Sequence, residues 1–213
     1  MDIIVFGARG DVGSRVVSEA LSRGHNVTAA VRSVDQLGSI PDAVSTLVAD
    51  AGDPCQITDA MTNNNVAISA LRPPSGQEHE LVDLTKSVLR AARSASVRTV
   101  IVGGAASLKV PGTNGHTVLS APGFLPDKVV PIARACQAQY ELCSTFKHAQ
   151  WSYLCPPAML QPGERTGHYR VGTDTLIVDL DGNSMISMED FAVALVDETE
   201  RASHLMRRFT VGY

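Results

Sequence analysis

The sequence predicts an α/β fold: a doubly wound, mainly parallel sheet with helices on both faces and a small C-terminal lobe. Short apolar runs alternate with amphipathic stretches, the links are mostly short, and a glycine-rich turn joins the first run to the first amphipathic stretch. Such alternation favours parallel strands joined by right-handed crossovers. The 213 residues suit one domain, with residues 1–155 as its core and residues 156–213 as a substrate-side lobe.

Seven apolar runs predict strands, because strands that are buried on both faces are apolar at consecutive positions. They cover residues 2–6, 26–32, 44–48, 65–69, 98–103, 151–155 and 208–211. Four stretches between them repeat apolar residues at helical spacing and predict helices over residues 11–23, 53–61, 78–94 and 127–148. A further strand is expected over residues 175–181, and Ser187 to Asp190 resembles a capping box that opens a last helix.

One segment, residues 104–126, interrupts this alternation. It is rich in Gly, Pro, Ser and Thr and has no helical stripe. A loop of this length inside a compact domain is usually functional. This one leaves the carboxyl end of the fifth strand, where open α/β sheets bind ligands. We therefore expect the loop to border the binding site.

The composition favours a small-molecule partner over nucleic acid or a membrane. The chain has 18 Lys and Arg against 22 Asp and Glu, and only 5 Phe, 4 Tyr and 1 Trp. It therefore offers neither a basic surface nor many aromatic rings on which bases could stack. No stretch approaches the ~20 apolar residues that span a bilayer. The sequence leaves open whether the protein is a monomer or a homodimer.

The four cysteines predict neither a metal site nor a disulfide. Cys55, Cys136, Cys143 and Cys155 form no C-x-x-C pair and no ligand spacing. Cys136 and Cys143 lie about 10 Å apart along a helix, too far for a disulfide. Reduced thiols are typical of the cytosol, and the N-terminus lacks the basic and apolar regions of a signal peptide. We therefore expect a cytoplasmic protein without bound metal.

A glycine-rich turn predicts a phosphate-binding site. Gly7, Gly10 and Gly13 follow the first strand with the spacing G-x-x-G-x-x-G. Gly7 suits the tight turn, Gly10 lets N–H groups approach a pyrophosphate, and Gly13 lets the helix pack closely. Asp11 and Val12 begin the helix, whose N-terminus attracts anions; the Asp11 side chain is expected to cap it and face away. Strand, turn and helix together indicate a Rossmann-like dinucleotide site.

The end of the second strand favours NADP over NAD. An NAD site usually places an acid here to hold the ribose 2′-hydroxyl, whereas an NADP site places an arginine for the 2′-phosphate. This chain has Arg32, with no acid before Asp35, and a second cation, Arg9, in the glycine turn. Two guanidinium groups can clamp one phosphate. The alternative is that either arginine simply lies in solvent.

Later strand ends add candidate contacts to the cofactor. Asp50 is placed to accept a hydrogen bond from the adenine amino group, although it is also suited to cap the helix near Asp53. The other candidates are mostly small or turn-forming residues at strand ends: Ala51, Ala70, Leu71, Arg72, Gly103, Gly104 and Pro156.

Several motifs along the whole chain resemble one family. They lie at residues 7–13, 102–108, 151–157, 162–169, 181–191 and 208–213. Together they resemble the atypical short-chain dehydrogenase/reductases, in particular the NAD(P)H-binding, NmrA-like branch that includes proteins called NADH-flavin reductases. The resemblance implies a sheet with strand order 3-2-1-4-5-6 plus a further strand, and oxidation of NAD(P)H with a flavin or related acceptor.

The chain lacks the Tyr-x-x-x-Lys pair of the main short-chain dehydrogenase line. No lysine lies four residues after any of its tyrosines, which argues against alcohol–ketone chemistry that uses a tyrosine as the acid. Ser107 is the remaining catalytic candidate, because it resembles the serine after the fifth strand in that line. A hydroxyl that caps a turn is the alternative interpretation of Ser107.

Two functions are compatible with these features. The first is an NADPH-dependent reductase that passes hydride to a flavin, quinone or similar small acceptor, with a flavin such as FMN as a substrate rather than a tightly held group. Its acceptor pocket is expected to be walled by residues 103–104, the following loop, and residues 156–157 and 159–163. The alternative is a non-enzymatic, NmrA-like redox sensor that binds NAD(P) and a protein partner.

Overall fold

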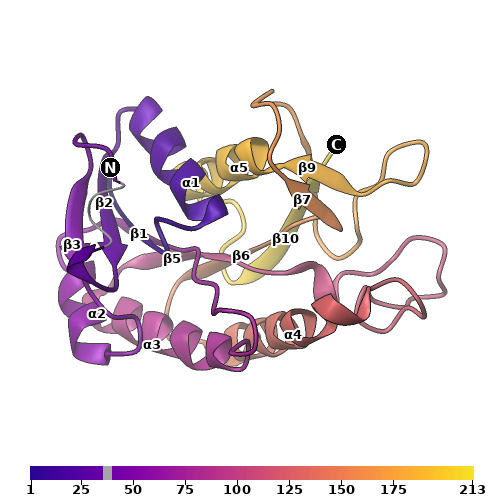
Figure 1. The fold of residues 1–213 in the computed structure, drawn as a ribbon, viewed down its shortest axis with the longest axis horizontal. Helices are drawn as coiled ribbons and strands as arrows, with labels where there is room; N and C mark the ends of the chain where they lie inside the picture. Colours follow the sequence, from indigo (N-terminus) through magenta and orange to yellow (C-terminus); the bar gives the residue numbers. More distant parts are fainter. Residues whose placement is uncertain (36–39) are drawn as a thin grey trace.

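A sheet of eight strands divides the molecule into layers (Figure 1). The computed structural model describes residues 1–35 and 40–213. The order in the sheet is β3-β2-β1-β4-β5-β6-β10-β8, and every neighbouring pair is parallel except β10 with β8. The expected order, with a further strand beside the sixth, is therefore confirmed. The strands are β1 (Asp2–Phe6), β2 (Asn26–Val31), β3 (Ser45–Val48), β4 (Val66–Ser69), β5 (Arg98–Val102), β6 (Trp151–Cys155), β8 (Arg170–Gly172) and β10 (Arg207–Gly212).

Helices cover both faces of the sheet, as the α/β prediction requires. α1 and α5 lie side by side on one face, and α2, α3 and α4 lie on the other (Figure 1). A small second sheet pairs β7 (Met159–Gln161) with β9 (Met185–Ser187). The helices are α1 (Asp11–Ser22), α2 (Pro54–Met61), α3 (Glu80–Ala95), α4 (Val130–Thr145) and α5 (Met188–Arg201).

Strand β1 shows why the central strands are apolar at consecutive positions. Ile3 and Val5 belong to the core beneath α1 and α5, whereas Ile4 and Phe6 belong to the core that contains α2 and α3. All four side chains are buried. Side chains alternate between the two faces of a strand, so a strand covered on both sides needs an apolar residue at every position.

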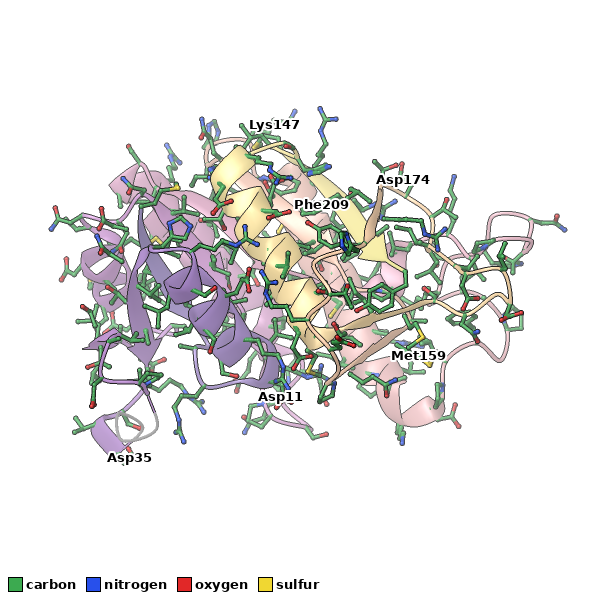
Figure 2. The ribbon with its side chains drawn as sticks, turned by 90° about the horizontal axis from the view of Figure 1, so that it is seen from above. Asp11, Asp35, Lys147, Met159, Asp174 and Phe209 are labelled. Atoms are coloured by element: carbon green, nitrogen blue, oxygen red, sulfur yellow. The ribbon has the colours of Figure 1, made fainter. Side chains whose placement is uncertain are left out.

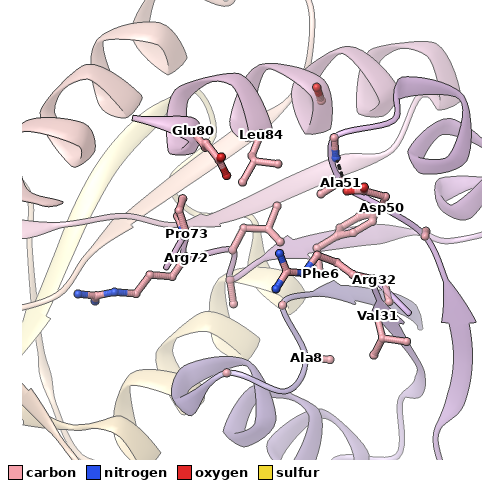
Figure 3. A pocket seen from close by; sticks show the side chains of 18 of the residues that line it. Phe6, Ala8, Val31, Arg32, Asp50, Ala51, Arg72, Pro73, Glu80 and Leu84 are labelled. Atoms are coloured by element: carbon pink, nitrogen blue, oxygen red, sulfur yellow. Dashed lines mark hydrogen bonds between the residues drawn. The ribbon is translucent and has the colours of Figure 1, made fainter. Parts of the chain in front are cut away.

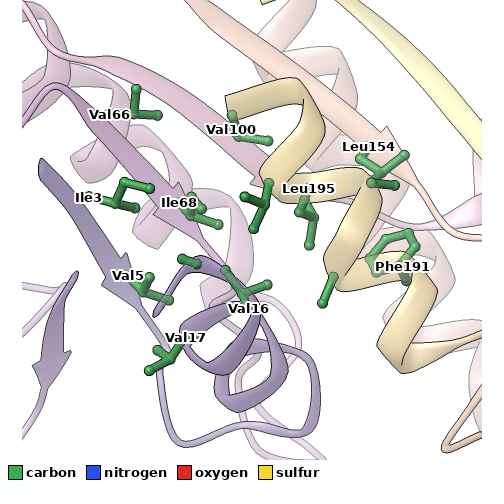
Figure 4. Close-up of a cluster of buried hydrophobic side chains, with 14 of the residues drawn as sticks. Ile3, Val5, Val16, Val17, Val66, Ile68, Val100, Leu154, Phe191 and Leu195 are labelled. Atoms are coloured by element: carbon green, nitrogen blue, oxygen red, sulfur yellow. The ribbon is translucent and has the colours of Figure 1, made fainter. Parts of the chain in front are cut away.

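One apolar cluster holds α1 and α5 on the sheet (Figure 4). Val16 and Val17 of α1 and Phe191 and Leu195 of α5 pack over side chains of β1, β4, β5 and β6. Full burial of a side chain of this size contributes ~1.5–3 kcal/mol. The cluster therefore positions α1 and, with it, the glycine turn at its N-terminus.

Local signals determine where three helices begin. The Asp53 carboxylate accepts from the first backbone N–H groups of α2, and the Ser187 hydroxyl accepts from the Asp190 N–H at 3.0 Å to open α5. Helix α4 is shorter than the expected 127–148. It follows a 3₁₀ turn (Asp127–Val129), and Pro131 lies in its first turn, where a missing N–H costs nothing.

The C-terminal part departs most from the sequence prediction. The strand expected over residues 175–181 is wrong: Thr175 makes one isolated bridge to Lys109, Leu176 is buried, and Leu180 is exposed. These apolar residues therefore serve separate contacts rather than one ladder. Helix α5 and strand β10 join the main layers, whereas β7, β9 and their loops lie beside them. A boundary at residue 155 stays a prediction.

Candidate functional site

The candidate site lies along the carboxyl ends of the parallel strands. In Figure 2, Asp11, Asp35 and Met159 lie along this edge of the molecule, and Lys147, shortly before β6, lies at the opposite edge. The connections change direction between β1 and β4, because β1 also pairs with β2 whereas β4 also pairs with β5. Such a switch point separates the loops on either side and leaves a crevice for a ligand.

Two cavities open at this edge. The first cavity has a volume of about 550 Å³ and lies over the ends of β1, β2, β3 and β4, against α3 (Figure 3). The Arg72 side chain extends away from Asp50 and Ala51 (Figure 3). The predicted residues in the lining of the first cavity are Gly7, Arg9, Gly10, Arg32, Asp50, Ala51, Ala70, Leu71 and Arg72.

The second cavity has a volume of about 620 Å³ and lies over the ends of β5 and β6. Helix α4 and the β7–β9 segment also contribute to its walls. The predicted residues in its lining are Gly10, Asp11, Val12, Ala70, Leu71, Arg72, Gly103, Gly104 and Pro156. Gly13 and Ser107 line neither cavity.

The two cavities meet at the glycine turn and the end of β4. They share Gly10, Ala70, Leu71, Arg72 and Pro73 in their linings. A ligand that crosses this shared wall would place one end over β2 and β3 and the other over β5 and β6. The site is therefore suited to an elongated molecule with an anionic middle.

The three glycines of the turn serve different ends. Gly7 has a φ of +76°, and a Cβ there would lie 2.4 Å from the Ala70 carbonyl oxygen. A Cβ on Gly13 would lie 2.1 Å from the Gly7 carbonyl oxygen. The fold itself thus requires these two glycines. A Cβ on Gly10 would meet only the Gly7 oxygen, at 3.3 Å, so the absent side chain at Gly10 mainly leaves space for a ligand.

The N-terminus of α1 presents backbone donors at the point where the cavities meet. Gly10 is the N-cap residue and has no side chain to accept from the first turn. Because the first N–H groups of a helix lack partners within it, they bind anions readily. The expectation that Asp11 caps the helix is wrong: Asp11 is the first helical residue, is exposed, and lines the second cavity.

Asp50 serves the turn after β3 rather than a helix. The cap of α2 is Asp53, whereas the Asp50 Oδ1 accepts from the Gly52 N–H at 2.8 Å. That bond holds the Asp50 carboxylate in the lining of the first cavity. The alternative in which Asp50 caps the helix is therefore excluded, and its contact with a base stays a prediction.

Gly103 and Gly104 are required by packing as well as by the cavity. A Cβ on Gly103 would lie 2.1 Å from the Tyr153 ring, and one on Gly104 would lie 2.6 Å from Cys136. The Gly104 N–H donates to the Tyr153 hydroxyl at 3.3 Å, and that hydroxyl donates to Gln139 Oε1 at 2.9 Å. Tyr153 lies outside the lining of the second cavity and supports its Gly103–Gly104 wall by packing and by a hydrogen bond. Burial raises the pKa of Tyr153 well above its ordinary value.

Ser107 lies outside both cavities and contacts Arg208. The Arg208 guanidinium donates to the Ser107 hydroxyl at 2.6 Å and to the Ser107 carbonyl oxygen at 3.0 Å. It also donates to Asp174 at 2.7 Å and lies over the Tyr140 ring. This arrangement gives the hydroxyl a structural role at the start of the loop. A catalytic role for Ser107 stays a prediction.

The second cavity lacks an ordinary acid–base residue. Of its described lining residues only Asp11, Arg72 and Cys136 carry a titratable side chain. Burial raises the pKa of the Cys136 thiol to about 11. Within the described chain, all four tyrosines lie outside the linings of both cavities. The site is therefore poorly equipped to protonate an alkoxide in the way that a Tyr–Lys pair does.

Several residues that line the two cavities were not predicted from the sequence. Glu80, Asp83, Leu84 and Ser87 of α3 line the first cavity. In the second, the wall from α4 and the turn before it comprises Val129, Ile132, Ala133 and Cys136, and Met188 of α5 adds to it. Positions 129, 132, 133 and 136 have the spacing of one helix face. Such a stripe has the same pattern whether it faces a core or a cavity, so the sequence alone could not assign it.

No helix within residues 1–35 and 40–213 has the length and apolar character to cross a membrane. The same residues contain no group of three or more His, Cys, Asp or Glu side chains placed to hold a metal ion.

A doubly wound sheet with a glycine turn at its switch point defines a dinucleotide-binding α/β protein. The comparison with known families gives the same class. The chain belongs to the NAD(P)H-binding family, whose model matches residues 7–201. The resemblance to atypical short-chain dehydrogenase/reductases is thereby confirmed.

Similar proteins cover the whole chain. "Uncharacterized protein YwnB" from Bacillus subtilis (strain 168) is 32% identical over 99% of this chain and 98% of its own. Among solved structures, a "putative exported protein" from Burkholderia pseudomallei is 37% identical with a TM-score of 0.90, covering 100% of both chains. A "putative epimerase" from Bacteroides thetaiotaomicron is 34% identical with a TM-score of 0.89, covering 100% of this chain and 96% of that one. A "putative NADH-flavin reductase" from Streptococcus pneumoniae TIGR4 is 28% identical with a TM-score of 0.89, covering 100% and 99%.

Proposed function

We propose that the protein is an NAD(P)H-dependent reductase, with NADPH preferred, that transfers hydride to a quinone, flavin or similar small acceptor. The observation that carries this proposal is the join between two unlike cavities. The first is bordered by charged groups and the second by apolar ones. A dinucleotide that crosses the shared wall brings its redox-active ring to the apolar cavity, where an acceptor can stack against it.

The residues present fit the dinucleotide. Gly10 leaves space at the N-terminus of α1, so backbone N–H groups would hold the pyrophosphate. Leu71 and Leu84 offer apolar surface to the adenine ring, and Asp50 offers a carboxylate at the same cavity. Gly103, Gly104 and the prolines after β6 border the second cavity, where the nicotinamide would lie.

Two arginines support the preference for NADPH. Arg9 and Arg32 both line the first cavity, at the ends of β1 and β2 respectively. Both are exposed, which is the usual condition of a side chain that meets a ribose phosphate. Arginine binds phosphate through paired N–H groups. The described residues of β2 include no acid that would repel a 2′-phosphate, and the residue that follows the strand is Arg32.

The chemistry asks little of the protein beyond position. When bound, the reduced dinucleotide supplies a hydride, which is two electrons and a proton, and is itself oxidised while the acceptor takes one further proton from water. The apolar walls of the second cavity would shield the faces of a bound ring from water, and the Gly103–Gly104 segment places no side chain in its approach. A quinone or flavin delocalises the charge that it receives, so a protein acid is not needed.

Turnover of purified protein tests the proposal. NADPH oxidation is followed with a naphthoquinone, riboflavin and FMN, each against a reaction without acceptor and one without protein. We expect acceptor-dependent oxidation, faster with NADPH than with NADH. Tight binding of NADPH without turnover of any acceptor would overturn the reductase and favour the NmrA-like sensor.

A further inference from the structure

The second cavity is unlike the first in the charge it can accommodate. The first has Arg9, Arg32 and Asp50 in its lining, together with the acids of α3. The described lining of the second has no hydroxyl, amide, imidazole or ammonium side chain, and its charged residues are Asp11 and Arg72. Asp11 follows the glycine turn and Arg72 follows the end of β4, so both lie near the wall that the two cavities share, where we propose that the dinucleotide crosses, and not at the wall formed by α4.

An anionic acceptor would meet unfavourable groups in this cavity. Asp11 is exposed and repels a phosphate or sulfonate. Arg72 belongs to the wall shared with the first cavity and acts electrostatically on both Glu78 and Cys136, but Asp11 offsets its charge, so the described lining of the second cavity offers no net positive charge to an anion. The bound dinucleotide adds further negative charge through its phosphates. Transfer of an unpaired ion to apolar walls is costly.

From these contacts we infer that the electron acceptor is an uncharged, apolar quinone rather than a phosphorylated flavin. This inference rests on the proposed reductase function and narrows its acceptor. A fused quinone ring needs apolar walls, which Leu160, Ile132 and Pro157 provide, and a cavity of about 620 Å³ has the size of a small-molecule site. Riboflavin is a weaker substrate because Asp11 and Arg72 are the only charged groups in the described lining that its polar ribityl chain could meet, and the rest of that lining is apolar or a thiol.

Matched acceptor pairs test the charge requirement. NADPH oxidation is measured with menadione against a naphthoquinone sulfonate, and with riboflavin against FMN. We expect kcat/KM for the uncharged member of each pair to exceed that of its anionic partner by at least ~10-fold, with menadione the best of the four. Equal or faster turnover of the anionic members would overturn the inference while leaving the reductase function intact. Absence of turnover with all four would overturn the reductase function instead.

Charge added at the rim of the cavity provides the second arm. Ala158 is exposed, lines the second cavity, and uses only its backbone N–H to contact the Ser184 hydroxyl. Ala158→Lys adds a cation without removing a packed side chain, and Ala158→Gln adds similar bulk without charge. We expect Ala158→Lys to raise the kcat/KM of the anionic member relative to its uncharged partner about 3- to 10-fold in each pair, whereas Ala158→Gln changes both members of a pair alike and leaves the two ratios as they were. An equal effect of Lys and Gln would show that bulk, not charge, governs the acceptor and would overturn the inference.

Discussion

At the scale of single residues, Gly10 and Gly13 show how one residue type can be required for different reasons. A Cβ on Gly13 would overlap the Gly7 carbonyl oxygen at 2.1 Å, whereas one on Gly10 would approach the same oxygen only to 3.3 Å. The backbone of Gly10 is extended, at φ −70° and ψ 166°, which any residue can adopt. Gly13 therefore serves the packing of α1, whereas packing does not require Gly10, which we propose leaves space for the ligand.

The two alanine variants should separate these roles. Gly13→Ala is expected to lower the free energy of unfolding by ~1–3 kcal/mol, because the backbone of the turn must move. Gly10→Ala should change stability little but weaken NADPH binding about tenfold or more, because its methyl group occupies the approach to the phosphates. Denaturant unfolding and NADPH titration measure the two effects. Loss of stability without loss of binding in Gly10→Ala would contradict this assignment.

Arg32 carries the predicted preference between the two dinucleotides. Arg32→Ala should weaken NADPH binding roughly 10- to 100-fold, the range expected when a hydrogen-bonded ion partner is lost, and should spare NADH. Arg9→Ala should act in the same direction but less. The exposed Arg90 on α3 lies outside both cavities, so Arg90→Ala is the matched control. Equal losses for NADPH and NADH in Arg32→Ala would refute a contact with the 2′-phosphate.

At the scale of elements, the loop over residues 162–169 is bonded to α1 and α5, the two helices that cover one face of the sheet. The Arg165 guanidinium donates to both carboxylate oxygens of Glu19 on α1, at 2.7 and 2.8 Å, and the hydrogen bond lowers the pKa of Glu19. The Gly163 N–H donates to Glu189 on α5 at 2.7 Å, and Glu189 accepts from Arg15 of α1 at 2.6 Å. The family-like motif at residues 162–169 thus has a structural role: it attaches this loop to α1 and α5.

Asp190 makes the most deeply buried of these attachments. Its carboxylate is fully buried and accepts from the Thr166 hydroxyl, the Gly167 N–H and the Tyr213 hydroxyl at 2.5, 2.7 and 2.7 Å. Burial by itself would raise the pKa of Asp190, but these hydrogen bonds outweigh it and hold the pKa below its ordinary value. By contrast, Arg165 is half exposed, and exposed ion pairs contribute little. Asp190 is therefore the attachment with the larger expected effect.

The Asp190 carboxylate should make stability depend on pH on the acid side. Because its pKa is lower in the folded chain, its contribution is complete above about pH 4, the pKa of an unfolded aspartate, and is lost as the pH falls through the folded value. Asp190→Asn should lower the free energy of unfolding at neutral pH by ~1–3 kcal/mol, because an amide cannot accept from all three donors. Asp190→Asn should also reduce the slope of the free energy of unfolding against pH on the acid side.

Denaturant unfolding of both proteins between neutral pH and pH 3 measures this effect. Asp59 is exposed on α2, so Asp59→Asn serves as the control and should match the unmodified protein. The assignment fails if Asp190→Asn retains the full acid-side slope.

At the scale of the whole molecule, the order of the strands places the site. The order of the connections reverses between the parallel strands β1 and β4, so the glycine turn after β1 and the segment after β4 diverge and both cavities meet between them. The same topology brings α4 and the β7–β9 segment over the ends of β5 and β6. The first cavity is therefore built from the first half of the chain, whereas the second combines the glycine turn, the end of β4 and α3 with segments that follow residue 101.

Most of the lining of the first cavity was predictable because its signals are local. Gly7, Gly10, Gly13, Arg9 and Arg32 follow strands that the apolar runs identify, and parallel strands bring their ends to one edge. The lining of the second cavity, the proposed acceptor site, was only partly predictable. Ser107 was chosen by its place after β5, yet its hydroxyl is bound by Arg208, which lies 101 residues further along the chain. Such a partner leaves no local mark in the sequence.

By itself, the sequence determined the class of fold, the strand order that the family resemblance implied, and the glycine turn between β1 and α1. These depend on periodicity and on backbone constraints within a few residues. Tertiary structure alone decided the character of the second cavity and the roles of Tyr153, Asp190 and the α4 stripe. An apolar side chain has the same sequence signature whether it faces a core or an opening, and a buried polar group is defined by partners that only folding brings within hydrogen-bond distance.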